Sequence, residues 1–264
     1  MSCMQCLQKE LNIIKLNIEK SFIDPIPNKF LKDFVLLGSK FVRSMLTILY
    51  LKSQNIEITE DIYKILVAGE LIHSASLLHD DVIDEADLRR GKPTLAKAFT
   101  PQISILAGDF LLSIAIEKIL ELNNLEILNI FKTCTKSMTE AEIKQYFLRN
   151  KEPIMEDYLS ICEGKTARLF SSILESSAIL SNLSVEKAKK FGEIFGICFQ
   201  IKNDLNFESA KLDKCNGIYT AKDIIGIEKT QNLLDNYKEE MNDFIKDFPE
   251  NIYKESLKDL IELL

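Results

Sequence analysis

The stretch ELIHSASLLHDDVIDEADLRRGKPT, residues Glu70–Thr94, decides how the rest of the sequence is interpreted. It begins as an apolar helical run and then presents Asp80 and Asp84, which lie one turn apart on a helix and share a face. Two carboxylates at this spacing suit Mg²⁺, which usually takes one or two protein carboxylates together with water and substrate phosphates. Arg89 and Arg90 follow directly and supply forked donors that fit phosphate oxygens. The stretch therefore predicts a metal–diphosphate site.

The charged residues also allow simpler explanations. An acidic run with basic neighbours is typical of a solvated helix face, but the apolar residues that lead into Asp80 favour a site at the mouth of something buried. Lys40 and Arg43 precede an apolar helical pattern at Met45–Leu51 and form a second candidate anion site. Ordinary helix-end charge is the alternative explanation for this second pair.

The composition restricts the fold and the partners. The 264 residues suffice for one large domain, and a hydrophobic content of 46% allows a substantial core. Only 9 Gly and 6 Pro are present and no strand-like alternation persists, so we expect an all-α fold in a single domain, residues 1–264. The net charge of -7 and the lack of a long basic tract argue against nucleic-acid binding.

The cysteines indicate a reducing compartment. Cys3 and Cys6 form a C-x-x-C pair, but no second pair exists and the only histidines are His73 and His79, which argues against a structural zinc site. Scattered cysteines of this kind are typical of a cytoplasmic protein. No signal-peptide pattern and no uncharged apolar run of membrane-spanning length occur, so no transmembrane segment is expected.

Helical patterns cover most of the chain. They are expected over residues 1–22, 30–37, 45–51, 59–79, 101–122, 125–146, 155–180, 184–207, 223–246 and 250–264. Gly91 and Pro93 predict a loop over residues 86–94, and Ser184 is a candidate N-cap.

Five short motifs, in this order along the chain, resemble those of the trans-polyprenyl diphosphate synthases, also called isoprenyl diphosphate synthases, and most closely the long-chain members. The run LLHDDVIDEADLRRG resembles the first aspartate-rich motif of that family. The other matching segments are Gly38–Arg43, Ala107–Leu111, Lys165–Phe170 and Phe195–Gln200, the last of which introduces the second aspartate-rich region.

The resemblance implies a fold and a reaction. The fold is a bundle of long, mostly antiparallel helices around a central cavity, the isoprenoid synthase fold. The reaction is the Mg²⁺-dependent condensation of isopentenyl diphosphate with an allylic diphosphate to give an all-trans polyprenyl diphosphate. The family is commonly homodimeric, so a homodimer is expected.

The resemblance also implies the roles of individual residues. The metal ligands would be Asp80, Asp84 and Asp204, and Asp81 would support them. Arg89 would hold the allylic diphosphate. The isopentenyl diphosphate site would consist of Lys40, Arg43, His73 and Arg90. Three further residues would lie near the allylic diphosphate and the reacting carbons: Lys165, Thr166 and Gln200.

The second aspartate-rich region departs from the family pattern. The three expected aspartates correspond to Asn203, Asp204 and Phe207, so only one carboxylate remains. Glu208 is close in sequence and is a candidate for compensation. The lysine-rich stretch that usually follows is shorter here and poor in matching lysines. We therefore expect weaker metal binding at this motif, or a greater dependence on substrate phosphates.

The length of the product is predicted from Ala75 and Ser76, which lie about one turn before the aspartates. In the family, bulky aromatic residues there close the cavity, whereas small residues leave it open. Two small residues predict a long-chain product such as a quinone side-chain precursor. The alternative is that these small residues only let two helices pack closely, with a deeper residue setting a shorter limit.

Other functions remain open at this point. The degraded second motif allows a non-catalytic or regulatory subunit of a polyprenyl synthase, and a shorter-chain farnesyl or geranylgeranyl synthase is a further alternative. A di-iron site is disfavoured because Glu70-x-x-His73 occurs only once and such sites need two pairs. Terpene cyclisation is disfavoured because it needs no isopentenyl diphosphate site.

Overall fold

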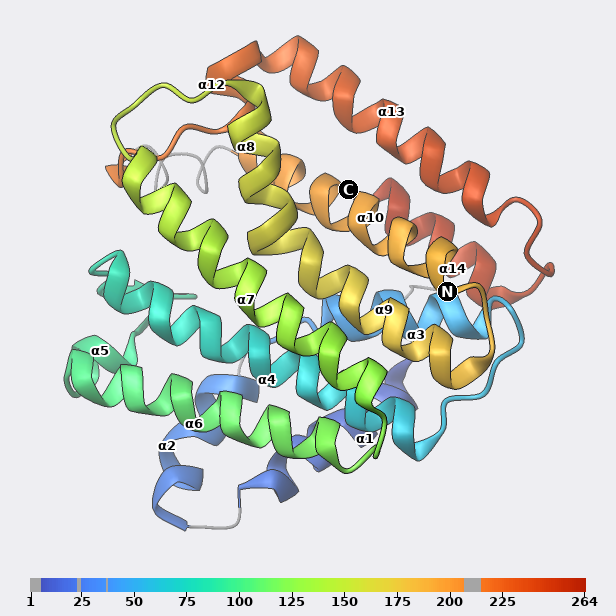
Figure 1. Ribbon diagram of the computed structural model, residues 1–264, viewed down its shortest axis with the longest axis horizontal. Helices are drawn as coiled ribbons and strands as arrows, with labels where there is room; N and C mark the ends of the chain where they lie inside the picture. The colour runs from blue at the N-terminus through green and yellow to red at the C-terminus, as the bar shows by residue number, and fades with distance from the viewer. Residues whose placement is uncertain (1–5, 23–24, 37, 207–214) are drawn as a thin grey trace. The chain divides into compact units, whose positions relative to one another are not determined.

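The computed structural model describes residues 6–22, 25–36, 38–206 and 215–264 (Figure 1). Contacts between Cα atoms divide the chain into two compact units. Among the described residues, the first unit contains those up to Ile48 together with Ile58–Leu128, and the second contains Leu49–Glu57 together with those from Asn129 to Leu264. The prediction of a single domain, residues 1–264, stays a prediction.

Helices form nearly all of both units. Those of the first unit are α1 (Gln8–Ser21), α2 (Pro25–Leu36), α4 (Glu60–Ile83), α5 (Leu95–Ala98) and α6 (Pro101–Leu120). Those of the second are α8 (Met155–Cys162), the π-helical turn η1 (Glu163–Ala167), α9 (Arg168–Ser181), α10 (Val185–Leu205), α12 (Ala221–Ile225), α13 (Ile227–Ile245) and α14 (Ile252–Glu262). The division falls within α3 (Val42–Lys52) and α7 (Leu125–Leu148). Within the described ranges, the strands are limited to β1 (Leu88–Arg89) and β2 (Lys92–Pro93), so the predicted all-α fold is confirmed.

The first unit is built on the antiparallel pair α4 and α6, which lie side by side (Figure 1). Thr59 caps α4 by accepting a hydrogen bond from the backbone N–H of Ile62 at 3.3 Å. At the far end of α4, the Ser104 hydroxyl of α6 donates to the carbonyl of Leu78 at 2.8 Å. Because a buried hydroxyl joins the helices there, the end of α4 that carries Asp80 is held against the beginning of α6.

The long helix predicted over residues 155–180 is interrupted by the π-helical turn η1. Gly164 lies within this turn, and a Cβ atom at that position would be 2.7 Å from the Cβ of Ala141 on α7. The turn can therefore approach α7 only because residue 164 has no side chain. Such π turns often lie at functional sites.

Close packing of α10 against η1 and α9 explains the motif glycine Gly196 and the preceding Gly192. A Cβ atom on Gly196 would lie 2.3 Å from the Cα of Ala167, and one on Gly192 would lie 2.6 Å from the Cα of Ser171. The connection between the helices contains Ser184, whose hydroxyl accepts from the N–H of Lys187 at 3.4 Å. The predicted N-cap is therefore confirmed.

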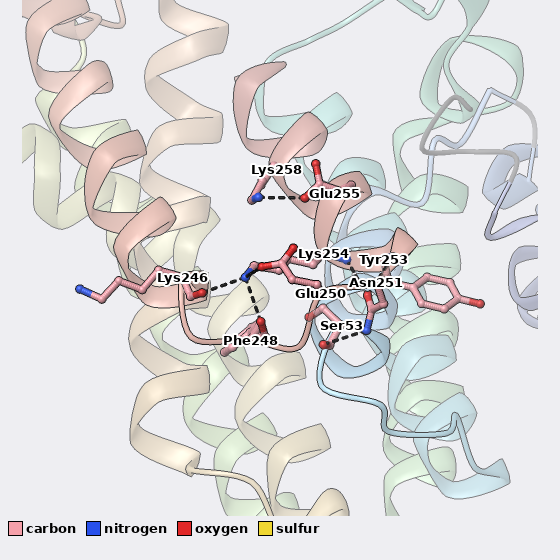
Figure 2. Close-up of polar contacts among 9 residues, drawn as sticks. All are labelled: Ser53, Lys246, Phe248, Glu250, Asn251, Tyr253, Lys254, Glu255 and Lys258. Carbon is pink, nitrogen blue, oxygen red and sulfur yellow. Dashed lines mark hydrogen bonds and ion pairs between the residues drawn. The ribbon is translucent and has the colours of Figure 1, made fainter.

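The C-terminal helix is fastened by two polar side chains (Figure 2). Asn251 accepts from the N–H of Lys254 at 2.9 Å and donates to the carbonyl of Ser53 at 3.1 Å. The buried Lys254 ammonium donates to the carbonyls of Lys246 and Phe248, each at 2.8 Å. The two bonds from Lys254 satisfy the carbonyl of Lys246, the C-cap of α13, and that of Phe248 in the connection to α14.

Candidate active site

The first aspartate-rich motif lies at the C-terminal end of α4. The helix continues past the predicted end at His79 to Ile83, and the N–H of Asp84 still donates to the carbonyl of Asp80 at 2.8 Å. Both aspartates are half-buried and mark the negative end of the helix dipole, which favours a cation. Their carboxylate chemistry therefore fits Mg²⁺.

The predicted loop after α4 is a tight hairpin. Arg90 and Gly91 have positive φ angles of 53° and 76° between β1 and β2, as a two-residue hairpin turn requires. The Nε of Arg89 donates to the fully buried carboxylate of Asp81 at 2.7 Å. Burial raises the pKa of Asp81, and the guanidinium of Arg89 opposes this effect. Asp81 thus fixes the orientation of Arg89, and its supporting role at a metal site stays a prediction.

A pocket of about 340 Å³ lies beside this hairpin within the first unit. Its polar lining includes Ser39, His73, Arg89, Arg90 and Lys92. The Nη1 of Arg90 donates to the hydroxyl of Ser39 at 3.3 Å. Three of the predicted diphosphate-binding residues therefore line one pocket, and Ser39 and Lys92 join them.

The imidazole of His73 is uncharged in this surrounding. Burial lowers its pKa well below its ordinary range. The guanidinium groups of Arg43, Arg90 and Arg89 lower this pKa further, so all three lie close to the ring. A neutral imidazole keeps one N–H donor, and therefore it can bind a phosphate oxygen without a charge of its own.

Arg43 lies beside a buried acid that the sequence did not reveal. Glu70 accepts hydrogen bonds from the N–H and the hydroxyl of Ser44 at 3.2 and 2.7 Å. Burial raises the pKa of Glu70, while Ser44 and Arg43 oppose this effect. Neither Arg43 nor Lys40 belongs to the pocket lining; Arg43 is buried near His73 and Glu70, whereas Lys40 is exposed.

The Gly108-Asp109 motif contacts His79, the residue directly before Asp80. A Cβ atom at Gly108 would lie 2.3 Å from the Nε2 of His79, so only glycine leaves room for this ring. The same nitrogen lies 3.3 Å from the carboxylate of Asp109. The motif therefore positions His79 directly before Asp80.

In the second unit, Thr166 and Gln200 lie together, whereas Lys165 is turned toward another helix. The hydroxyl of Thr166 donates to the side-chain carbonyl of Gln200 at 3.1 Å. Lys165 forms an ion pair with Glu142 of α7 and donates to Gln145 at 2.8 Å. The turn η1 thus directs Thr166 toward α10 and Lys165 toward α7.

Asp204 is enclosed by hydrogen-bond donors. One of its oxygens accepts from the Tyr158 hydroxyl at 2.7 Å and from the N–H of Ala221 at 3.0 Å. The other accepts from the side-chain amide of Gln200 at 2.9 Å. Burial raises the pKa of Asp204, and these donors oppose the effect. The carboxylate is 1% exposed, so its surroundings do not fit direct binding of Mg²⁺.

The structure describes only part of the rest of the second motif. Asn203 is half-buried, whereas Phe207 and Glu208 lie outside the described residues. In the described part of the chain, no group of three or more His, Cys, Asp or Glu side chains is placed to hold a metal ion. Among the described residues, Asp80 and Asp84 are a pair of carboxylates whose chemistry fits a cation.

The two predicted chain-length residues differ in their surroundings. Ala75 is completely buried. Ser76 is half-buried, and its hydroxyl donates back to the carbonyl of His73 at 2.8 Å. A large side chain therefore has more room at Ser76 than at Ala75.

Sequence reasoning missed four groups that support the site: Glu70, Glu142, Tyr158 and Lys92. Lys92 directly follows the Arg89-Arg90-Gly91 turn, so its position offered a signal. The other three act through partners 20 or more residues away in the chain, and no local pattern marks them.

Comparison with known proteins decides the family. A family model described as polyprenyl synthetase matches residues 24–254. The chain belongs to the polyprenyl synthetase family. It is 35% identical over 177 residues to an all-trans-nonaprenyl-diphosphate synthase (geranyl-diphosphate specific) of Rhodobacter capsulatus, which covers 66% of this chain and 54% of that protein. It is also 35% identical over 172 residues to the octaprenyl diphosphate synthase of Escherichia coli K12, covering 64% and 53%. The chain thus spans about half the length of these curated relatives.

Solved structures of the family share the fold. A decaprenyl diphosphate synthase from Rhodobacter capsulatus superposes with a TM-score of 0.90 at 22% identity, covering 99% of this chain and 97% of the other. A geranyltranstransferase from Thermotoga maritima gives a TM-score of 0.82 at 28% identity, covering 97% and 95%. The predicted isoprenoid synthase fold is therefore confirmed. Within the described ranges, each helix is too short or too polar to cross a membrane.

Proposed function

We propose that this polyprenyl synthetase family member is a prenyltransferase that joins isopentenyl diphosphate to an allylic diphosphate. One observation carries the proposal. The pocket lined by His73, Arg89 and Arg90 adjoins the end of α4, because Arg89 also binds Asp81 within the aspartate motif. Phosphate-binding cations and metal-binding carboxylates are thus combined in one place.

The residues of the site divide the chemical work. Arg89, held by Asp81, binds the allylic diphosphate, while Arg43, Arg90 and neutral His73 bind isopentenyl diphosphate. Mg²⁺ held by Asp80 and Asp84 would stabilise the negative charge on the leaving diphosphate. The allylic C–O bond breaks to give diphosphate and a carbocation, and the double bond of isopentenyl diphosphate attacks that cation. Loss of a proton to the diphosphate restores the double bond, so the protein contributes mainly positioning and charge.

Two facts support a long-chain product. The relatives at 35% identity are named for nonaprenyl and octaprenyl products. Ala75 and Ser76 are small. Because Ser76 is half-buried, Ser76→Phe should shorten the product without unfolding the protein. Ala75 is fully buried, so Ala75→Phe should also overpack the core at a cost of about 1–3 kcal/mol.

A turnover assay tests both the reaction and the chain length. The full chain is incubated with radiolabelled isopentenyl diphosphate and allylic primers of several lengths, with Mg²⁺ or with EDTA, and the dephosphorylated products are separated by chromatography. We expect long polyprenyl products only with Mg²⁺. Products of three or four isoprene units that Ser76→Phe does not alter would refute the long-chain prediction.

The second candidate is a non-catalytic or regulatory subunit of a polyprenyl synthase. It is favoured by the buried position of Asp204 and by the two replaced aspartates of the second motif. In that case the isolated chain would show no turnover with any primer. Restoring the aspartates of the second motif by substitution would not produce turnover either. Addition of a catalytic partner would then be required for product formation.

A homodimer and a cytoplasmic location complete the proposal. Helix α6 exposes large apolar side chains, including Leu106 and Ile116 at 63% and 51% exposure, which a self-association surface would cover. Leu106→Glu should shift the mass measured by light scattering from dimer to monomer. The described cysteines are free thiols, as expected in a reducing compartment.

A further inference from the structure

The carboxylate of Asp204 is the centre of a four-element junction in the second unit. Its donors come from α8 through Tyr158, from α10 through Gln200, and from the first residue of α12 through Ala221. Gln200 in turn accepts from Thr166 of η1 at 3.1 Å. A single buried carboxylate therefore holds four segments in one arrangement.

Apolar contacts and a helix cap strengthen this junction. Tyr158, Cys162 and Ala221 form a buried cluster, against which Ile224 of α12 also packs. The side chain of Asp223 accepts from the N–H and the hydroxyl of Thr220 at 2.9 and 2.6 Å, which caps α12. The beginning of α12 is thus fixed to α8 and α10 by several independent bonds.

We propose that Asp204 is a positioning residue rather than a metal ligand, and that through Gln200 it orients the hydroxyl of Thr166. Tyr158, which no sequence motif marks, has the same positioning role because it donates to Asp204. Metal binding by the protein then depends on Asp80 and Asp84. In this proposal Asp204 positions other side chains, whereas the first motif binds the metal.

The hydrogen bonds of Asp204 explain why it cannot serve both purposes. Three donors occupy its two oxygens, and 1% of the residue is exposed. To bind an ion it would have to release Tyr158 or Ala221, and the buried group left without a partner would be destabilised. A metal ligand of this type instead needs an open oxygen and a negative charge.

Two substitutions separate positioning from metal binding. Asp204→Asn removes the charge but keeps one side-chain oxygen, which can still accept from Tyr158 and Ala221. The new side-chain NH₂ group can donate to the side-chain oxygen of Gln200, provided that the Gln200 amide turns over. Thr166 then accepts where it formerly donated. Asp204→Ala removes every acceptor. We therefore expect Asn to rescue what Ala loses, whereas a metal ligand would lose its function in both variants.

The first measurement is independent of turnover. Mn²⁺ binding is followed by electron paramagnetic resonance with the full chain and inorganic diphosphate, with Asp235→Asn on the exposed face of α13 as the control. We expect the Mn²⁺ affinity of Asp204→Asn to equal that of the wild type and the control, and that of Asp80→Asn to fall by about tenfold or more. A loss in Asp204→Asn as large as that in Asp80→Asn would overturn the proposal.

The second measurement is amide hydrogen exchange at Ala221. We expect Asp204→Asn to retain protection, and Tyr158→Phe, which keeps the ring but removes one donor, to exchange about tenfold faster. If Asp204→Ala does not fold, Tyr158→Phe still tests the junction. Unchanged protection of Ala221 in Tyr158→Phe and in a folded Asp204→Ala would refute the junction.

The catalytic readout rests on the proposed function. In Tyr158→Phe we expect kcat to fall by about tenfold while the KM for isopentenyl diphosphate and the Mg²⁺ activation constant stay constant. If the isolated wild-type chain shows no turnover, the proposed prenyltransfer fails, but the Mn²⁺ and exchange results still decide the role of Asp204. A rise in the Mg²⁺ activation constant of Tyr158→Phe, with kcat unchanged, would contradict positioning.

Discussion

The carboxylates at the end of α4 and the carboxylate near the end of α10 differ in everything except residue type. Asp80 and Asp84 are half-buried and lie one turn apart at the end of a helix, next to an arginine hairpin. Asp204 is enclosed by Tyr158, Gln200 and the N–H of Ala221. The surroundings of an aspartate, rather than its place in a motif, decide whether it can bind a cation or must hold the fold together.

Within the first region, the same rule separates neighbours. Asp81 is fully buried and bound to Arg89, although Asp80 directly before it is half-buried. A helix places successive residues on different faces, so Asp81 orients an arginine while Asp80 and Asp84, at positions i−1 and i+3, stay partly exposed. Three aspartates within five residues thus have two different surroundings.

The largest effect is expected for the carboxylates at the end of α4. Asp80→Ala or Asp84→Ala should lower kcat on the order of a thousandfold or more, about 4 kcal/mol of lost charge stabilisation, with the helical circular dichroism unchanged. Steady-state rates across Mg²⁺ concentrations measure it. Asp61→Ala, at the exposed start of the same helix, is the matched control and should retain activity. Near wild-type rates in either site variant would remove the metal assignment.

A moderate effect is expected for the buried aspartate between them. Asp81→Asn removes the charge that orients Arg89, so the KM for the allylic diphosphate should rise by about tenfold while the Mg²⁺ activation constant changes little. Asp87→Asn is the control, because Asp87 pairs with Lys97 on the surface at 3.0 Å. If the activation constant rises and the KM does not, Asp81 is a metal ligand rather than a support for Arg89.

How much of this could be predicted depends on the range of the interaction. The end of α4 and the turn at Arg90 and Gly91 are local, and the spacing of their residues predicted a carboxylate pair followed by a turn with two arginines. The partners of Asp204 are not local, since Tyr158 lies 46 residues earlier in the chain. The motif therefore suggested a ligand, and only the tertiary contacts showed a buried, fully hydrogen-bonded group.

The interrupted helices have the same explanation. Residues 155–180 have a continuous helical pattern, and the π turn depends on the approach of α7 to Gly164. Likewise, the helix predicted over residues 223–246 is divided by Gly226, which has a φ angle of 84° between α12 and α13. Periodicity predicts which face is buried, but it does not predict where a neighbouring helix or a glycine changes the backbone.

A smaller effect sharpens the comparison at the second region. Asn203→Asp restores one carboxylate of the family pattern at a half-buried position and should lower the Mg²⁺ activation constant by about threefold, because ligand charge tunes affinity. Lys202→Gln changes the net charge by the same amount without adding a ligand. Equal effects of the two substitutions would mean that the added negative charge, and not a new metal ligand, changes the Mg²⁺ activation constant. No effect of Asn203→Asp would mean that this region does not bind metal.

The smallest effect concerns ionisation rather than activity. The pKa of His73 is lowered by burial and by three nearby arginines, so the folded protein binds fewer protons at this ring than the unfolded chain does. The folded protein therefore keeps the ring neutral as the pH falls through about 6.5, the ordinary pKa of histidine. The unfolded chain takes up a proton there, so the free energy of unfolding declines below that pH. Since His73 and His79 are the only histidines, their ring signals can be assigned by nuclear magnetic resonance with a His73→Gln variant. We expect the His73 signal to stay constant between about pH 7.5 and pH 6. Movement of that signal with a midpoint near 6.5 would show that the ring is protonated in the folded protein, and His73 would then bind phosphate as a cation.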